Sequence, residues 1–236
     1  ELREEPAWSV RSRQVFLSDS LRRAGESAST ETTGALTYGS LLRDNVDGVD
    51  GLDAAFSVTI SPDGQHVYVA AINDNSVAWF TRDASTGTIA YAGVLIDGVA
   101  DVNGLNGARD VTISPDGRHA YVAAYSDDSV AWFDRNATTG ALTYGGFLTD
   151  GVDGGDELDG ARDVTISPDG QNAYVAAHLD NSVAWFDRNA TTGALTYGGV
   201  RKDDVDGVDG LNGPYIVRVS PDGQHAYVAA YSDHSV

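Results

Sequence analysis

The chain has 236 residues, of which 35 are acidic and 15 are basic, and it contains no cysteine. The lack of cysteine excludes disulfides, thiol nucleophiles and cysteine-bound zinc. The net charge of −20 argues against nucleic-acid partners and anionic membrane surfaces, because the protein's own field would repel both. No apolar stretch approaches the roughly 20 residues of a membrane-spanning helix, so we expect no membrane insertion.

Residues 1–31 differ in composition from the rest of the chain. They hold five of the six glutamates and five of the 14 arginines, and they lack the long apolar stretch of a secretory signal. The chain does not begin with methionine, so we expect a processed or excised piece, or a chain whose true start is missing. We interpret residues 1–31 as an atypical N-terminal segment that donates a strand, Val10–Leu17, to a neighbouring sheet.

Residues 32–236 are built from a repeat of 53 residues. The motif Ser-Pro-Asp-Gly begins at positions 61, 114, 167 and 220, and tryptophan recurs with the same step at positions 79, 132 and 185. Residues 108–146 and 161–199 differ at only five of 39 positions. Such similarity indicates duplication of one structural unit.

Each unit is expected to form four short strands. Trp185 and Phe186 are neighbours in one strand and point to opposite faces, which indicates a sheet that is buried on both faces. An antiparallel unit of this kind, about 50 residues long, predicts an all-β fold: a β-propeller with about four blades per chain. In the third copy we expect the strands at residues 161–167, 172–177, 182–187 and 194–200, with a Pro-Asp-Gly turn after the first.

The run SPDGQNAYVAAHLDNSVAWFDRNATTGALTY, from Ser167 to Tyr197, resembles the YVTN-type propeller repeat. That repeat is shared by lactonase-type propellers, the 6-phosphogluconolactonase-like group, and by bacterial surface-layer proteins. For the lactonase group, the resemblance implies arginine, histidine and acidic residues at the channel mouth that hold and hydrolyse a lactone. Lactonase-type members usually have seven blades, whereas this chain has three complete units and additional pieces.

Aspartates and glycines fill the loops between successive units. Clustered carboxylates suit Ca²⁺, which binds several oxygen ligands, and glycine lets the backbone turn sharply around the ion. The spacing of every third residue differs from that of an EF-hand loop, and an acidic, well-hydrated connector is the alternative interpretation. The candidate calcium ligands are Asp44, Asp47, Asp50, Asp150, Asp153, Asp156, Asp203, Asp206 and Asp209.

The start of each first strand supplies a second candidate site, because ligands of propellers commonly bind at the mouth of the central channel. The equivalent positions hold Phe56, Arg109, Arg162 and Tyr215, and the two arginines can clamp a carboxylate or a phosphate. The alternative is structural: ion pairs of the Arg109–Asp163 type join adjacent blades. We favour the structural interpretation, because residues that recur in the repeat usually serve the repeat.

The histidines give weaker indications. His66, His119 and His225 share one position after the tight turn, where we expect an exposed hairpin without a catalytic role. His178 and His234 each lie near an aspartate in the loop after the second strand, and a histidine there can act as a general base. No serine or second acid is convincingly placed near either, so we predict no catalytic residue.

The near-identity of the units argues against an enzyme, because an active site on a propeller axis needs different residues from different blades. We therefore expect a non-catalytic binding or structural scaffold that is extracellular, periplasmic or at the cell surface, with a small molecule or glycan as ligand. Two alternatives stay open: a lactone hydrolase that uses the channel-mouth arginines, and a carbohydrate-binding propeller in which Tyr125 and Tyr231 stack on sugars.

The ends of the repeated part are complementary. It begins with a lone fourth strand, Ala35–Leu41, and ends with a first strand at Tyr215–Ser220 and a second at His225–Ala230. We expect these pieces to share one composite blade. Four blades are the low end of the propeller range, so we favour a homodimer with eight blades; a four-bladed monomer and a fragment of a larger ring are the alternatives.

Overall fold

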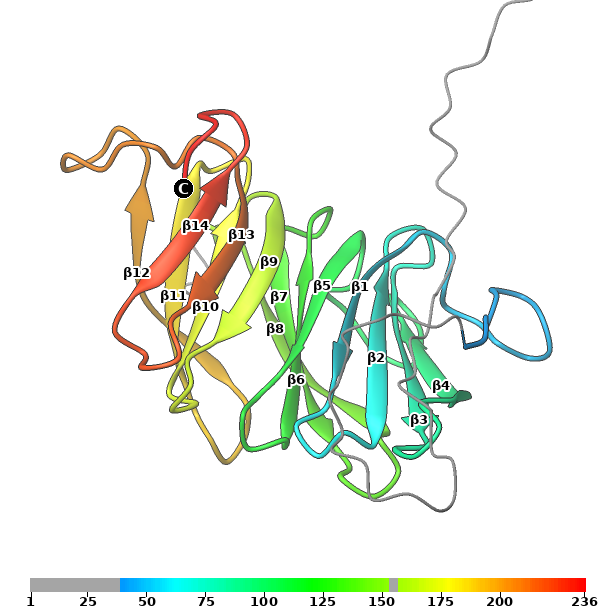
Figure 1. Cartoon of the computed structure of the whole chain (residues 1–236). Helices are drawn as coiled ribbons and strands as arrows, with labels where there is room; N and C mark the ends of the chain where they lie inside the picture. Colours follow the sequence, from blue (N-terminus) through cyan, green and yellow to red (C-terminus); the bar gives the residue numbers. More distant parts are fainter. Residues whose placement is uncertain (1–38, 153–156) are drawn as a thin grey trace, which may run out of the picture.

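The computed structural model of the chain describes residues 39–152 and 157–236, which form fourteen strands (Figure 1). Within these ranges no helix is long and apolar enough to cross a membrane. The predicted N-terminal segment, with its strand Val10–Leu17, lies outside the described residues.

Three four-stranded antiparallel sheets and one two-stranded sheet follow each other along the chain. Blade 1 contains β1 (Ala55–Ile60), β2 (His66–Ala71), β3 (Ser76–Arg82) and β4 (Ile89–Ile96). Blade 2 contains β5 (Ala108–Ile113), β6 (His119–Ala124), β7 (Ser129–Arg135) and β8 (Leu142–Thr149). Blade 3 contains β9 (Ala161–Ile166), β10 (Asn172–Ala177), β11 (Ser182–Arg188) and β12 (Leu195–Lys202), and blade 4 contains β13 (Pro214–Val219) and β14 (Ala226–Ala230).

The prediction of consecutive propeller blades is confirmed. In the third copy, each observed strand agrees with its predicted range to within two residues at either end. The predicted strand Ala35–Leu41 lies mostly outside the described residues, and its described part, residues 39–41, has no strand. The blades contact each other in chain order through their first strands, with blade 1 on the right of Figure 1 and blades 3 and 4 overlapping on the left.

The turn between the first two strands of each blade is fixed by its own side chains. In blade 1, the Asp63 carboxylate accepts hydrogen bonds from the Ser61 hydroxyl (2.5 Å) and the Gln65 amide (3.0 Å). Gly64 has a φ of 70°, a conformation that glycine adopts without steric cost. The same bonds recur at each Ser-Pro-Asp-Gly motif, so the motif directs the hairpin locally.

The hydrophobic core lies between successive blades. Phe80, Phe133 and Phe186 are fully buried, as expected for a sheet that is covered on both faces. The tryptophan before each phenylalanine packs over a glycine of the outermost strand: a Cβ on Gly146 would lie 2.6 Å from the Trp132 ring. The outer strand therefore needs glycine at this position.

A polar cluster also joins neighbouring blades inside this core. Between blades 1 and 2, the Tyr68 hydroxyl donates to the Gly140 carbonyl (2.8 Å) and accepts from Arg135 Nε (2.7 Å). Arg135 Nη2 donates to Asp63 (2.8 Å) and to His66 Nδ1 (2.9 Å). Tyr121, Arg188, Asp116 and His119 repeat the arrangement between blades 2 and 3. The buried arginine is thus fully engaged, as a charge inside a core must be.

The expectation that the recurring histidines decorate an exposed hairpin is wrong for two of them. His66 and His119 are each 2% exposed, whereas His225 is exposed. Burial and the neighbouring arginine lower the pKa of His66 and of His119, so each ring stays neutral and its Nδ1 accepts from the arginine. The next blade covers these histidines, which a single repeat does not reveal.

Candidate functional site at the channel mouth

The first strands β1, β5, β9 and β13 lie side by side, and together they line a pocket of about 360 Å³. The four ligand-binding candidates from the sequence, Phe56, Arg109, Arg162 and Tyr215, all border this pocket. The structure therefore brings together residues that are up to 159 positions apart, because the repeat places them at one height in the channel.

Both arginines lie over aromatic rings. The guanidinium carbon of Arg109 is 3.7 Å from the centre of the Tyr125 ring, and that of Arg162 is 3.4 Å from the centre of the Tyr215 ring. The centre of the Phe56 ring is 5.8 Å from the guanidinium carbon of Arg109 and 5.5 Å from that of Arg162. The two cations therefore converge on one side chain. Stacking of this kind orients a guanidinium and leaves its N–H edge available to a ligand.

Neither arginine has an acidic partner in the part of the chain that the structure describes. No ion pair among residues 39–152 and 157–236 includes Arg109 or Arg162, and Arg109 Nε is buried without a hydrogen-bond acceptor. The predicted Arg109–Asp163 type of bridge is therefore wrong. Asp163 instead pairs with Arg218 at 2.7 Å, a residue that replaces the threonine of the other three copies.

The aspartates that follow the two arginines connect the blades. Asp110 accepts from the Ser57 hydroxyl (2.5 Å) and the Val164 amide (3.1 Å), which belong to the blades on either side. Asp163 accepts from the Val217 amide (2.9 Å) and is 5% exposed. Burial, and next the Asp110 carboxylate, raise the pKa of Asp163 to about 6 despite the bonds from Val217 and Arg218. Asp163 is thus a buried carboxyl that titrates near neutral pH.

Aromatic residues from the loops complete the mouth. The His178 ring lies between Tyr125 and Tyr215, at 6.2 and 5.1 Å from their ring centres, and its Nδ1 is buried without a partner. Arg109 covers one face of Tyr125, and Tyr231 stacks on Tyr215 at 5.1 Å. Of the two tyrosines considered for sugar stacking, Tyr125 is therefore half-buried under Arg109, whereas Tyr231 is 64% exposed.

The acidic loops have a structural role that the sequence did not reveal. The first aspartate of each loop accepts a hydrogen bond from the backbone amide eight residues later, at 2.8–3.0 Å, and so closes the loop. The pairs are Asp44 with Leu52, Asp97 with Leu105, Asp150 with Leu158 and Asp203 with Leu211. Asp47 and Asp206 adopt positive φ values of 53° and 52°, which aspartate tolerates better than most residues.

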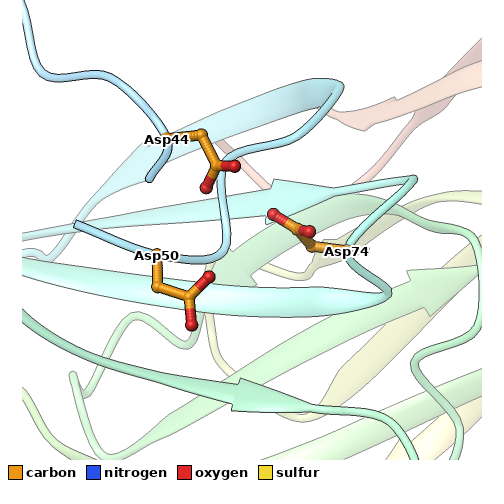
Figure 2. Close-up of side chains that lie close together, drawn as sticks. All are labelled: Asp44, Asp50 and Asp74. Atoms are coloured by element: carbon orange, nitrogen blue, oxygen red, sulfur yellow. The ribbon is translucent and has the colours of Figure 1, made fainter. Parts of the chain in front are cut away.

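Three carboxylates converge in the first loop only, within the described part of the chain. Asp44 and Asp50 of the loop and Asp74 of the turn after β2 have oxygen atoms within 4.8 Å of each other (Figure 2). Burial, and then the neighbouring carboxylates, raise the pKa of Asp74. Asp153 and Asp156 lie outside the described residues. Calcium binding stays a prediction, and among the described residues the first loop brings the most carboxylates together.

Sequence reasoning missed two groups of residues. The first group is the Tyr–Arg–Asp–His clusters between blades. Their tyrosines and arginines recur with the 53-residue step, and this recurrence could have pointed to them. Arg218 was detectable as a departure from the repeat, because the equivalent positions hold Thr59, Thr112 and Thr165. Arg218 therefore gives the channel wall a charge that the equivalent positions of the other copies lack.

A protein-family comparison matches this chain at residues 26–149 and 155–236 to the model described as lactonase, 7-bladed beta-propeller. The match covers most of the chain, so the chain belongs to that family. No curated protein matches it.

Several solved structures share the fold. A protein from Bacteroides uniformis, provisionally named 6-phosphogluconolactonase, is 22% identical with a TM-score of 0.59, over 84% of this chain and 53% of that one. A Lactobacillus plantarum protein is 24% identical with a TM-score of 0.59, over 74% and 50%. The periplasmic gluconolactonase PpgL from Pseudomonas aeruginosa is 21% identical with a TM-score of 0.53, over 61% and 39%. The chain spans about half the length of the first two proteins.

Proposed function

We propose that this member of the lactonase family is a ligand-binding propeller whose channel mouth takes a small organic anion. The observation that carries the proposal is the state of the two arginines: both lie over aromatic rings, and within residues 39–152 and 157–236 neither has a carboxylate partner and the buried Arg109 Nε has no acceptor. A buried guanidinium N–H without a partner costs free energy, and a ligand carboxylate or phosphate removes that cost.

The pocket also indicates the size and character of the ligand. Its volume of about 360 Å³ is at the small end of the range for ligand sites. Both arginines, the Phe56 ring near them, and the carboxylates Asp110 and Asp163 line the pocket. A sugar acid fits this combination, because its anionic group binds arginine and its hydroxyls can donate to carboxylates. The names of the similar structures, which mention gluconolactone and its phosphate, support the same class.

Calorimetric titration of the wild-type chain tests this proposal. We expect gluconate and 6-phosphogluconate to bind with a stoichiometry near one per chain, the phosphate ester more tightly. Glucose is the neutral control, and it should give no heat at the same concentrations. Absence of binding by both anions at millimolar concentration, or equal binding of glucose, would refute the proposal.

Lactone hydrolysis is the second candidate, and Asp163 is the observation that favours it. A carboxyl with a pKa of about 6 can accept a proton from a water molecule near neutral pH, while the arginines stabilise the oxyanion that forms on the lactone carbonyl. A pH-stat assay with gluconolactone tests this activity against spontaneous hydrolysis. Turnover above the spontaneous rate that is lost in Asp163→Asn would make the protein an enzyme; its absence would leave the binding role alone.

A further inference from the structure

The contacts between blades 1 and 2 and between blades 2 and 3 each bury a histidine against an arginine. Arg135 Nη2 of blade 2 lies 2.9 Å from His66 Nδ1 of blade 1, and Arg188 Nη2 of blade 3 lies 2.8 Å from His119 Nδ1 of blade 2. A guanidinium can only donate hydrogen bonds, so each Nδ1 must carry a lone pair and each ring must be neutral. Each contact therefore forms with only one protonation state of its histidine.

Both histidine rings are closed off from water. Each is 2% exposed, and a turn of the next blade covers it. A Cβ on Gly140 would collide with the His66 ring, and a Cβ on Gly193 would collide with the His119 ring. A proton that enters such a ring creates a cation that water does not hydrate, and an uncompensated buried charge is costly.

The charged groups around His66 do not compensate for a proton on its ring. The ring faces the Arg135 cation and the Asp63 carboxylate, and these two already pair with each other at 2.8 Å. The Tyr68 hydroxyl is also engaged, because it accepts from Arg135 Nε. A proton on Nδ1 would point at the guanidinium, so the two cations must separate. A movement of Arg135 then breaks its bonds to Asp63 and Tyr68 as well.

The surroundings of His119 include one more acid. The titratable and charged side chains around this contact, among the described residues, are Arg188, Asp116, Tyr121, Asp134 and Arg118. His119 Nε2 lies 3.2 Å from the Asp134 carboxylate, whose side chain is 64% exposed, so water screens the attraction of this acid for a proton on the ring. The equivalent position in blade 1 holds Thr81. We therefore expect the contact at His66 to be the more sensitive to acid.

We propose that these two contacts are a pH-sensitive switch between blades: they hold at neutral pH, and the uptake of a proton by His66 or His119 opens the contact that contains it. Proton uptake breaks the histidine–arginine bond first and the other bonds of that arginine with it. Asn172 occupies the equivalent position in blade 3, so the repeat also accepts a side chain that does not titrate. This inference does not depend on the ligand.

Urea denaturation at a series of pH values between about 7.5 and 5 tests the proposal on the complete chain. Burial, and then the neighbouring arginine, lower the pKa of both histidines. The folded chain therefore binds fewer protons than the unfolded chain, and its stability falls as pH falls below about 6.5. Between pH 6.5 and 5.5, each histidine should raise the equilibrium constant of unfolding about fivefold.

Histidine variants separate this effect from that of the carboxylates, which all variants share. His66→Asn and His119→Asn should each lack one fivefold increase relative to the wild type, and the double variant should lack both. His225→Asn is the matched control, because His225 occupies the same position of the repeat but is exposed. Its dependence of stability on pH should equal that of the wild type.

Hydrogen exchange measured by mass spectrometry tests whether the opening is local. After correction for the intrinsic effect of pH on exchange, the turns 136–141 and 189–194, which cover the two histidines, should lose protection at pH 5.5. The equivalent turn 83–88 covers no histidine in the described part of the chain and should keep its protection. Equal pH dependence of the wild type and both single variants, or unchanged protection of the two covering turns, would overturn the proposal. If a variant does not fold, hydrogen exchange of the wild-type chain decides.

Discussion

The inter-blade cluster makes a quantitative prediction, because the repeat supplies its own control. Tyr121 is completely buried, and its hydroxyl donates to the Gly193 carbonyl (2.8 Å) and accepts from Arg188 Nε (2.7 Å). Tyr121→Phe leaves a carbonyl and a guanidinium N–H without partners, at about 1–3 kcal/mol each. We therefore expect a loss of about 2–6 kcal/mol in the free energy of unfolding.

Tyr174→Phe is the same substitution at the equivalent position of blade 3. Tyr174 is only partly buried, and among the described residues its hydroxyl makes neither of the hydrogen bonds that Tyr121 makes with Gly193 and Arg188. We expect a loss within about 0.5 kcal/mol, as for most substitutions away from such contacts. The two variants thus differ in what surrounds the hydroxyl, and not in the group removed.

Urea denaturation followed by tryptophan fluorescence, at one fixed protein concentration, measures both variants. In a thermal melt, each kcal/mol of this difference would lower the melting temperature by roughly 2–4 °C for a chain of this size. Equal losses in the two variants, or a loss below about 1 kcal/mol for Tyr121→Phe, would refute the role assigned to the cluster.

Three further outcomes are expected. Because burial raises the pKa of Asp163 from 3.8 to about 6, the folded chain holds a proton between these values that the unfolded chain releases, and stability falls as pH rises across this window; Asp163→Asn should lack this fall, and an unchanged dependence of stability on pH would contradict its assignment to Asp163. Gly193→Ala should lower the free energy of unfolding by about 1–3 kcal/mol more than Gly207→Ala does. Both glycines have a positive φ, but only a Cβ on Gly193 meets a side chain, the His119 ring at 2.5 Å. Equal melting temperatures of the two variants would contradict this prediction. Calcium titration of chelator-treated protein tests the first loop, where Asp50→Asn should abolish any heat; a signal that survives the substitution would place the site elsewhere.

Most of the fold was predictable from the sequence, because the repeat and its turns act locally. The Ser-Pro-Asp-Gly motif forms its hairpin through its own side chains, so strand positions followed from the motif. The channel-mouth arginines were also predictable, since equivalent positions of successive blades meet at one height. What they contact was not: Arg109 lies on Tyr125, and Asp163, its predicted partner, pairs with Arg218.

The remaining errors share a physical cause, which is packing between repeats. His66 follows a polar turn and looks exposed in one unit, but the next blade covers it and places Arg135 against its ring. The acidic loops suggested metal ligands by composition, whereas their first aspartates close the loops through backbone amides. Contacts between units depend on how the blades stack, and a single repeat contains no information on that arrangement.

The most direct test of the central claim is the binding of 6-phosphogluconate to arginine variants, measured by calorimetry. Arg109→Gln and Arg162→Gln should each weaken binding about tenfold to a hundredfold, the loss expected for a hydrogen bond between charged groups. Arg118→Gln removes the same charge from an exposed position in the hairpin after β5, and it should bind like the wild type. Equal affinity of all three variants and the wild type would contradict an anion site at the channel mouth.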